Sequence, residues 1–248
     1  MKTTTVRPRD GLDQVPIPPR TELFHFPELE ALCPDRCDFS AVIFDFDGTL
    51  GDSMWVWENI DDLFCERHGL VLPDTYYDDL TTLSFEQTAR FFQEDLGVKM
   101  TTEEIADEFN YLAHASYAGE VACKPGAHRY LEILKNRGVA IGIATSLSWY
   151  LLEAVLESNG IQEYFDDMAF CDESHGKGEP DVYLLAAERL GARPEDCLVF
   201  EDIVVGIESA HRAGMTAGAV IDPHYQQDST LIKQIADFHI ETFEDLLH

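Results

Sequence analysis

Two pairs of carboxylates each follow a short apolar run: Asp45 and Asp47 in the segment FDFDGTL, and Glu201 and Asp202 in the segment VFED. Residues two apart on a strand point to the same side, and α/β folds bind ligands at the carboxyl ends of their strands. Two carboxylates at such an end, followed by the sharp turn that Gly48 permits, could hold a hard cation and offer a nucleophile. One pair alone is weak support, because acidic residues also cap turns.

Residue types that bind phosphate follow two further segments. Thr145 and Ser146 end the run IGIATS, where a hydroxyl and successive backbone amides at a helix N-terminus could hold phosphate oxygens. Lys177 stands between two glycines in GKGEP and could neutralise a phosphate or a nucleophilic carboxylate. Each has a simpler explanation, since Ser and Thr commonly cap helices and a loop lysine is usually exposed.

The elements that must position these residues alternate between strand and helix. Helical segments that end at glycines separate five apolar, β-branched runs, which predict strands at 41–46, 139–144, 168–171, 198–200 and 216–221. Short buried strands alternating with helices are typical of a parallel sheet with helices on both faces. The sequence therefore predicts a doubly wound α/β core.

One connection is too long for this pattern. From Asp47 to Thr145 the chain runs 98 residues, whereas a βαβ unit needs about 30. Within this stretch, residues 54–121 have the pattern of helices only, with capping-box spacing at Ser84 to Gln87 and at Thr101 to Glu104. We therefore expect a helical cap domain at 54–121, inserted into a core formed by 38–53 and 122–248.

Residues 1–37 differ from the rest of the chain. They contain six of the eleven prolines and no sustained helical or strand period. This composition is typical of an extension that lies over the surface or is partly disordered, and a binding arm is the alternative interpretation.

Charge and composition exclude several classes of partner. The chain has 17 Lys and Arg against 47 Asp and Glu, a net charge of −30, which repels nucleic acids and anionic lipid surfaces. No apolar run reaches the 18 or so residues of a membrane span and the first residues lack a secretory pattern, so we expect a cytoplasmic protein. Its six cysteines form no CxxC pair, which favours free thiols over disulfides.

Taken together, four segments resemble the signature blocks of the haloacid dehalogenase superfamily of phosphohydrolases: VIFDFDGTLGDS, ATS, GKGEPDVYLLAAERLG and CLVFEDIVVGIESAHRAGM. The resemblance covers about residues 40–222, and the helical insertion stands where subfamily IA of that superfamily carries its cap. It implies a Rossmann-like core and a Mg²⁺-dependent phosphatase that acts on a small phosphomonoester, such as a sugar or metabolite phosphate.

The resemblance also implies roles for individual residues. Asp45 would take the phosphoryl group as an aspartyl-phosphate, Asp47 would protonate the leaving oxygen and then activate water, and Lys177 would balance charge. The residues implied for phosphate binding are Gly48, Thr145, Ser146 and Lys177. Those implied for Mg²⁺ are Asp45, the carbonyl of Asp47, Asp202 and, as an assisting ligand, Glu201.

Other activities stay open at this point. Asp47 argues against the dehalogenase branch, which lacks the second aspartate, while β-phosphoglucomutases share the same core motifs. Such mutases carry an arginine at the start of a cap helix, where this chain offers Phe85 beside Glu86, although Arg90 could substitute. A non-catalytic binding protein is the third alternative. The aromatic residues expected to line a closed site are Trp55, Trp57 and Phe85, and the oligomeric state is open.

Overall fold

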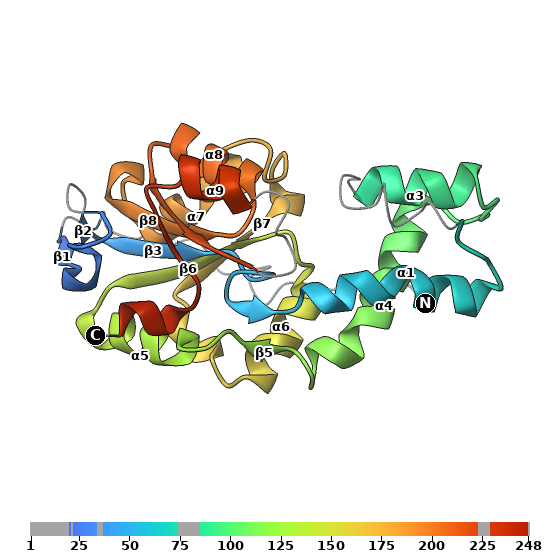
Figure 1. Cartoon of the computed structure of the whole chain (residues 1–248), viewed down its shortest axis with the longest axis horizontal. Helices are drawn as coiled ribbons and strands as arrows, with labels where there is room; N and C mark the ends of the chain where they lie inside the picture. Colours follow the sequence, from blue (N-terminus) through green and yellow to red (C-terminus); the bar gives the residue numbers. More distant parts are fainter. Residues whose placement is uncertain (1–19, 21, 34–36, 74–84, 223–228, 248) are drawn as a thin grey trace, which may run out of the picture.

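The computed structural model describes residues 20, 22–33, 37–73, 85–222 and 229–247. A six-stranded sheet lies beside a group of helices that projects from one end of it (Figure 1). Its strands follow the order β10-β9-β8-β3-β6-β7, and every neighbouring pair is parallel. Their bounds are β3 Ala41–Phe44, β6 Ala140–Thr145, β7 Asp167–Phe170, β8 Cys197–Glu201, β9 Thr216–Val220 and β10 Phe238–Ile240. This order confirms the predicted doubly wound, Rossmann-like core.

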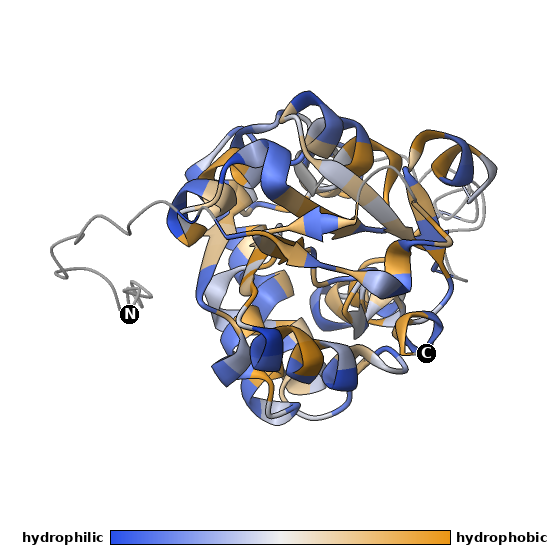
Figure 2. Cartoon of the chain, turned by 90° about the vertical axis from the view of Figure 1, so that its left-hand side faces the viewer, coloured by the Kyte–Doolittle hydropathy of each residue, from blue (hydrophilic) through white to orange (hydrophobic). Residues whose placement is uncertain are grey.

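Helices cover both faces of the sheet (Figure 2). Val42 and Phe44 of β3 pack on the side of α5 and α6, whereas Ile43 packs on the side of α7, α8 and α9. A central strand buried on both sides needs a continuous apolar run, which is the pattern of AVIF. The helix bounds are α5 Ala127–Arg137, α6 Trp149–Ser158, α7 Asp181–Leu190, α8 Val204–Arg212 and α9 Ser229–Ile235.

Five of the six strands correspond to the predicted runs within two residues at each end. The sixth, β10, was not predicted because its three residues are too short to show a period. Short 3₁₀ turns complete the core: η2 Gln162–Tyr164, η3 Cys171–Glu173, η4 Pro194–Asp196 and η6 Phe243–Leu246.

Between β3 and β6 the described chain is mainly helical, as the sequence predicts. The helices are α1 Met54–His68, α3 Phe85–Glu94 and α4 Thr102–Tyr117. The rings of Phe64, Phe92 and Phe109 contact one another at centroid distances of 4.9 to 5.9 Å and form the centre of this group. The capping box of Thr101 is present, whereas Ser84 lies outside the described residues.

Two short strands connect these helices to the core. β4 (Gly51–Asp52) and β5 (Ala122–Cys123) pair antiparallel, so the chain leaves and re-enters the core at one place. Nearby, α4 packs against core helix α6: Ser148 Oγ donates to Asn110 Oδ1 at 2.7 Å, and the His114 ring stacks on Tyr150.

Part of the N-terminal region belongs to the core. β1 (Phe24–His25) pairs antiparallel with β2 (Asp38–Phe39), with the 3₁₀ turn η1 (Pro27–Leu29) between them. Phe26 and Leu29 are fully buried, and the Phe26 ring meets Phe39 edge to face at 5.4 Å. The packing of residues 24–33 therefore corrects the prediction of a surface extension for this part of the chain. The sequence pattern missed it because two-residue strands joined by a turn have no period.

None of the six cysteines, all of which lie in the described part of the chain, forms a disulfide, as predicted. Across the described part of the chain, no helix has the length and apolar character needed to cross a membrane.

Candidate active site

The strand order brings three sequence segments to one edge of the sheet. β3 lies between β6 and β8, and the chain passes from β3 to β6 on one side and later to β8 on the other. Ligands of open α/β sheets bind at such a switch point, outside the carboxyl ends of the strands. Asp45 directly follows β3, Thr145 ends β6 and Glu201 ends β8.

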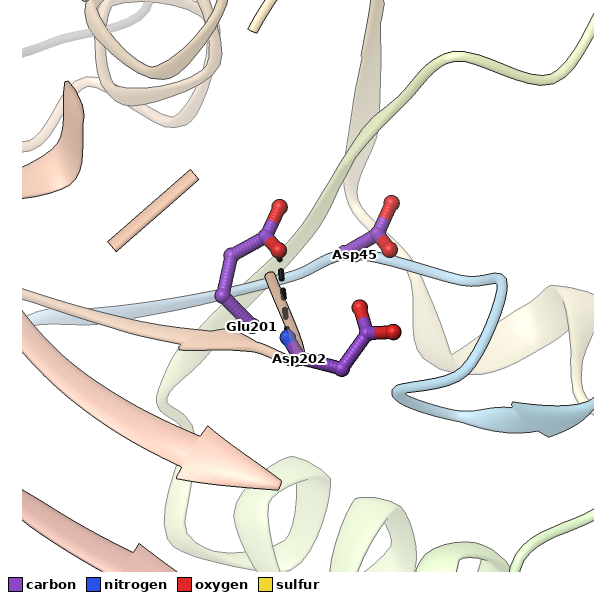
Figure 3. Close-up of side chains that lie close together, drawn as sticks. All are labelled: Asp45, Glu201 and Asp202. Atoms are coloured by element: carbon purple, nitrogen blue, oxygen red, sulfur yellow. Dashed lines mark hydrogen bonds between the residues drawn. The ribbon is translucent and has the colours of Figure 1, made fainter. Parts of the chain in front are cut away.

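Three buried carboxylates meet at this edge. Asp45, Glu201 and Asp202 each offer an oxygen, and these oxygens lie within 4.8 Å of one another (Figure 3). Thr49 Oγ1 donates to Asp202 Oδ1 at 3.1 Å. Gly48 has a φ of +73°, and a Cβ there would lie 2.1 Å from Asp202 Oδ2, so only glycine permits this approach.

The grouping is electrostatically unfavourable by itself. Burial raises the pKa of Asp45 well above its ordinary value, against the opposing charge of Lys177. Burial and the neighbouring charge of Glu201 raise the pKa of Asp202 to about 7. An all-oxygen, acidic donor set of this kind fits a hard divalent cation, whose charge would stabilise the ionised carboxylates.

Lys177 is a buried member of the site and not an exposed loop residue. Its Nζ lies 2.5 Å from Asp45 Oδ1 and 2.5 Å from Glu201 Oε1. Burial lowers the pKa of the ammonium, but the surrounding carboxylates outweigh burial and raise it. Lys177 is therefore a cation fixed between the carboxylate that follows β3 and the one that ends β8.

Thr145 and Ser146 lie at the next strand end. The β3–β6 register pairs Phe44 with Ile143, so Asp45 and Thr145 leave the sheet at adjacent positions. Thr145 is buried and its Oγ1 accepts a hydrogen bond from the amide of Leu147, whereas Ser146 is exposed. The backbone turns here into α6, which leaves amides directed outward at the helix N-terminus.

The Asp47 side chain is directed toward the inserted helices. Ser53 Oγ and Tyr117 Oη each donate to Asp47 Oδ1 at 2.6 Å, and Trp57 Nε1 donates to Oδ2 at 3.1 Å. Burial raises the pKa of Asp47, while the hydrogen bonds from Ser53 and Tyr117 act in the opposite direction. Three donors, from Ser53 before α1, from α1 and from α4, thus hold one carboxylate between the core and the inserted helices.

The aromatic residues expected to line the site have different places. Trp57 contacts Asp47, whereas the indole N–H of the partly buried Trp55 donates to the carbonyl of Asp52. The side chain of Phe85 lies outside the described residues.

Three hydrogen bonds of the site could not be predicted from the sequence pattern. Tyr117 reaches Asp47 across 70 positions, Tyr183 donates to Glu201 Oε1 at 2.7 Å, and Thr49 supports Asp202. Buried tyrosines on amphipathic helices have the pattern of core residues, so only the folded structure reveals their hydroxyl partners.

Known proteins match this chain over most of its length. The family model described as haloacid dehalogenase-like hydrolase matches residues 39–214. Hexitol phosphatase A of Escherichia coli strain K12 is 32% identical over 190 residues, which are 76% of this chain and 85% of that protein. The phosphorylated carbohydrates phosphatase of Thermotoga maritima is 28% identical over 176 residues, which are 71% of this chain and 82% of that protein.

A solved structure shows the same fold. CbbY from Rhodobacter sphaeroides in complex with phosphate matches with a TM-score of 0.72 and 24% identity, covering 84% of this chain and 96% of that one. This neighbour therefore shares the fold of most of the chain.

Proposed function

The chain belongs to the haloacid dehalogenase-like hydrolases, and we propose that it hydrolyses small phosphomonoesters by way of an aspartyl-phosphate on Asp45. The observation that carries this proposal is the buried Lys177, held 2.5 Å from Asp45 beside two further carboxylates at the switch point of the sheet. Phosphoryl transfer needs alignment and positive charge more than covalent machinery, and this edge of the sheet offers both.

In the first half of the proposed reaction, an Asp45 oxygen forms a bond to phosphorus while the ester oxygen leaves with a proton from Asp47. Thr145 and the amide of Ser146 hold the oxygens of the transferring group, and the sharp turn at Gly48 lets the backbone approach it. In the second half, Asp47 takes a proton from water, and that water attacks phosphorus and releases Asp45 and inorganic phosphate. Two easier steps replace one difficult displacement.

Asp45, Asp202 and the main-chain carbonyl of Asp47 would hold Mg²⁺. When bound, the ion supplies positive charge that neutralises the carboxylates and the phosphoryl oxygens. The oxygen donors at this edge and their burial support Mg²⁺ as the metal.

The substrate class we propose is a small phosphorylated metabolite, in the cytoplasm. Hexitol phosphatase A and the phosphorylated carbohydrates phosphatase are relatives whose names indicate such substrates, and the net charge of −30 disfavours nucleic acid. Assays of phosphate release from a generic aryl phosphate and a panel of phosphometabolites, each with and without Mg²⁺, test the activity. No Mg²⁺-dependent release from any of them would contradict it.

The same function predicts hydrolysis rather than isomerisation of a sugar phosphate. A mutase must hold a second phosphate, which needs a cation near the cap helices, and Arg90 of α3 is exposed in this structure. The side chains of Phe85 and Glu86 lie outside the described residues. With β-glucose 1-phosphate, Mg²⁺ and a trace of the 1,6-bisphosphate, we expect free phosphate to accumulate. Glucose 6-phosphate formed faster than phosphate would instead establish a mutase.

A second expectation concerns how Asp47 acts. Removing the hydroxyl in Tyr117→Phe leaves the carboxylate with two donors and a less defined orientation, so proton transfer to the leaving oxygen should slow about tenfold for an alkyl phosphate. For p-nitrophenyl phosphate, whose leaving group needs no proton, the change in kcat/KM, which reports the first half of the reaction alone, should stay within about twofold.

Tyr111→Phe is the matched control, because Tyr111 is an exposed tyrosine on the same helix and should affect neither substrate. An equal loss of kcat/KM on both substrates in Tyr117→Phe would contradict a role of this hydroxyl in proton transfer to the leaving oxygen.

A further inference from the structure

Glu201 is the most completely bonded of the three carboxylates. Its Oε1 accepts from Lys177 Nζ at 2.5 Å and from Tyr183 Oη at 2.7 Å. Its Oε2 accepts from the backbone amide of Asp202 at 3.1 Å, the dashed line in Figure 3, and from that of Ile203 at 3.4 Å. A carboxylate offers about four acceptor positions, so these donors occupy its whole capacity.

The other two carboxylates are bonded differently. Within the described residues, the Asp45 carboxylate accepts from Lys177 alone, through Oδ1, and the Asp202 carboxylate accepts from Thr49 alone, through Oδ1. Each therefore keeps its second oxygen available for a cation, whereas Glu201 would have to give up an existing donor.

The surroundings of Glu201 also prevent it from turning. Its side chain is fully buried, and a Cβ added at Gly206 of α8 would lie 2.4 Å from its carboxyl carbon. The backbone of α8 thus lies against one side of the carboxylate, and Tyr183, itself fully buried on α7, bonds to it. Both helices belong to the same layer of the core.

We propose that Glu201 is the anchor of Lys177 and not a metal ligand, and that Tyr183 is the positioning residue that keeps Glu201 in place. Glu201 draws the ammonium to a fixed point between two carboxylates, which leaves Asp45 ionised with one free oxygen. Without this anchor Lys177 would turn toward Asp45 and Asp202 and compete with both the metal and the phosphoryl group. The inference rests on the proposed function, in which Asp45 is the nucleophile.

The experiment compares four variants of the full-length protein. Glu201→Gln removes the charge of the anchor, and Tyr183→Phe removes one donor to it at nearly constant volume. Asp202→Asn alters a proposed metal ligand. Tyr130→Phe is the matched control, since Tyr130 is a fully buried tyrosine whose hydroxyl has no hydrogen-bond partner among the described residues.

Two measurements separate the roles: Mn²⁺ binding by calorimetry in the absence of substrate, and kcat with KM in Mg²⁺. We expect Asp202→Asn to weaken Mn²⁺ binding by tenfold or more, and Glu201→Gln and Tyr183→Phe to change it by about threefold at most. The kcat should fall about a hundredfold in Glu201→Gln and about tenfold in Tyr183→Phe, because buried hydrogen bonds to charged groups are strong. The KM should change little in both variants. Tyr130→Phe should match the wild type in both.

Mn²⁺ binding in Glu201→Gln as weak as in Asp202→Asn would make Glu201 a ligand and overturn the inference. So would a Tyr183→Phe protein that behaves like Tyr130→Phe. Because metal binding is measured without turnover, its result holds even if the wild-type protein released no phosphate, which would count against the proposed function instead. If Glu201→Gln does not fold, Tyr183→Phe alone decides.

Discussion

Replacing Asp45 with asparagine should lower phosphate release by a factor of about a thousand or more. Asparagine keeps the shape of the side chain but removes the anion that would form the bond to phosphorus. Lys177, now facing one carboxylate instead of two, cannot restore a nucleophile. The measurement is steady-state turnover, together with acid-quenched reactions on a ³²P-labelled substrate, which should leave label on the wild-type protein and none on Asp45→Asn.

The control for this variant is Asp52→Asn, which makes the same chemical change at an exposed aspartate of β4. It should retain wild-type turnover. Circular dichroism of both variants establishes that the fold is intact. An Asp45→Asn protein with a tenth of wild-type turnover would rule out covalent catalysis at this residue.

Removing divalent metal should abolish turnover, and excess Mg²⁺ should restore it. The physical reason is the grouping of Asp45, Glu201 and Asp202 within 4.8 Å, in which Lys177 is one cation against three carboxylates. Asp202→Asn should therefore need a Mg²⁺ concentration at least about ten times higher for half-maximal activity. Its thermal stability should not decrease in the absence of metal, because the substitution removes one of several like charges from a buried place.

To measure this dependence, Mg²⁺ is added stepwise to protein that has been treated with EDTA and dialysed, and phosphate release is followed. A parallel series uses Ca²⁺, a second ion of the same charge. The restored activity should depend on the ion, since coordination geometry differs between Mg²⁺ and Ca²⁺. Full activity in the presence of chelator would contradict a metal-dependent reaction.

Local patterns were sufficient to predict five of the six strands of the central sheet. The apolar runs around Val42 and Val199 correspond to β3 and β8, because strands buried on both faces must be continuously hydrophobic. The length between Asp47 and Thr145 predicted a helical insertion, and three described helices lie there. Strands as short as β1 and β10 escaped this reasoning, since two or three residues carry no period.

The residue types at the site could also be predicted, because carboxylates, a lysine and hydroxyls each follow the end of a predicted strand. The hydrogen-bond and ion-pair partners of these residues could not be predicted. The pattern around Lys177 was equally compatible with an exposed loop, and its burial between Asp45 and Glu201 depends on how that loop folds over the sheet edge.

The amino-acid sequence by itself determined five strands of the central sheet, the presence of a helical insertion and which residue types stand at the strand ends. These properties depend on neighbours a few positions apart. Only the tertiary structure decided that Asp47 accepts from Tyr117, that Tyr183 supports Glu201 and that Phe26 belongs to the core. Such contacts join residues between 13 and 70 positions apart. They depend on strand register and helix packing, because a hydrogen bond forms only when both atoms lie within about 3 Å, a condition that no local pattern encodes.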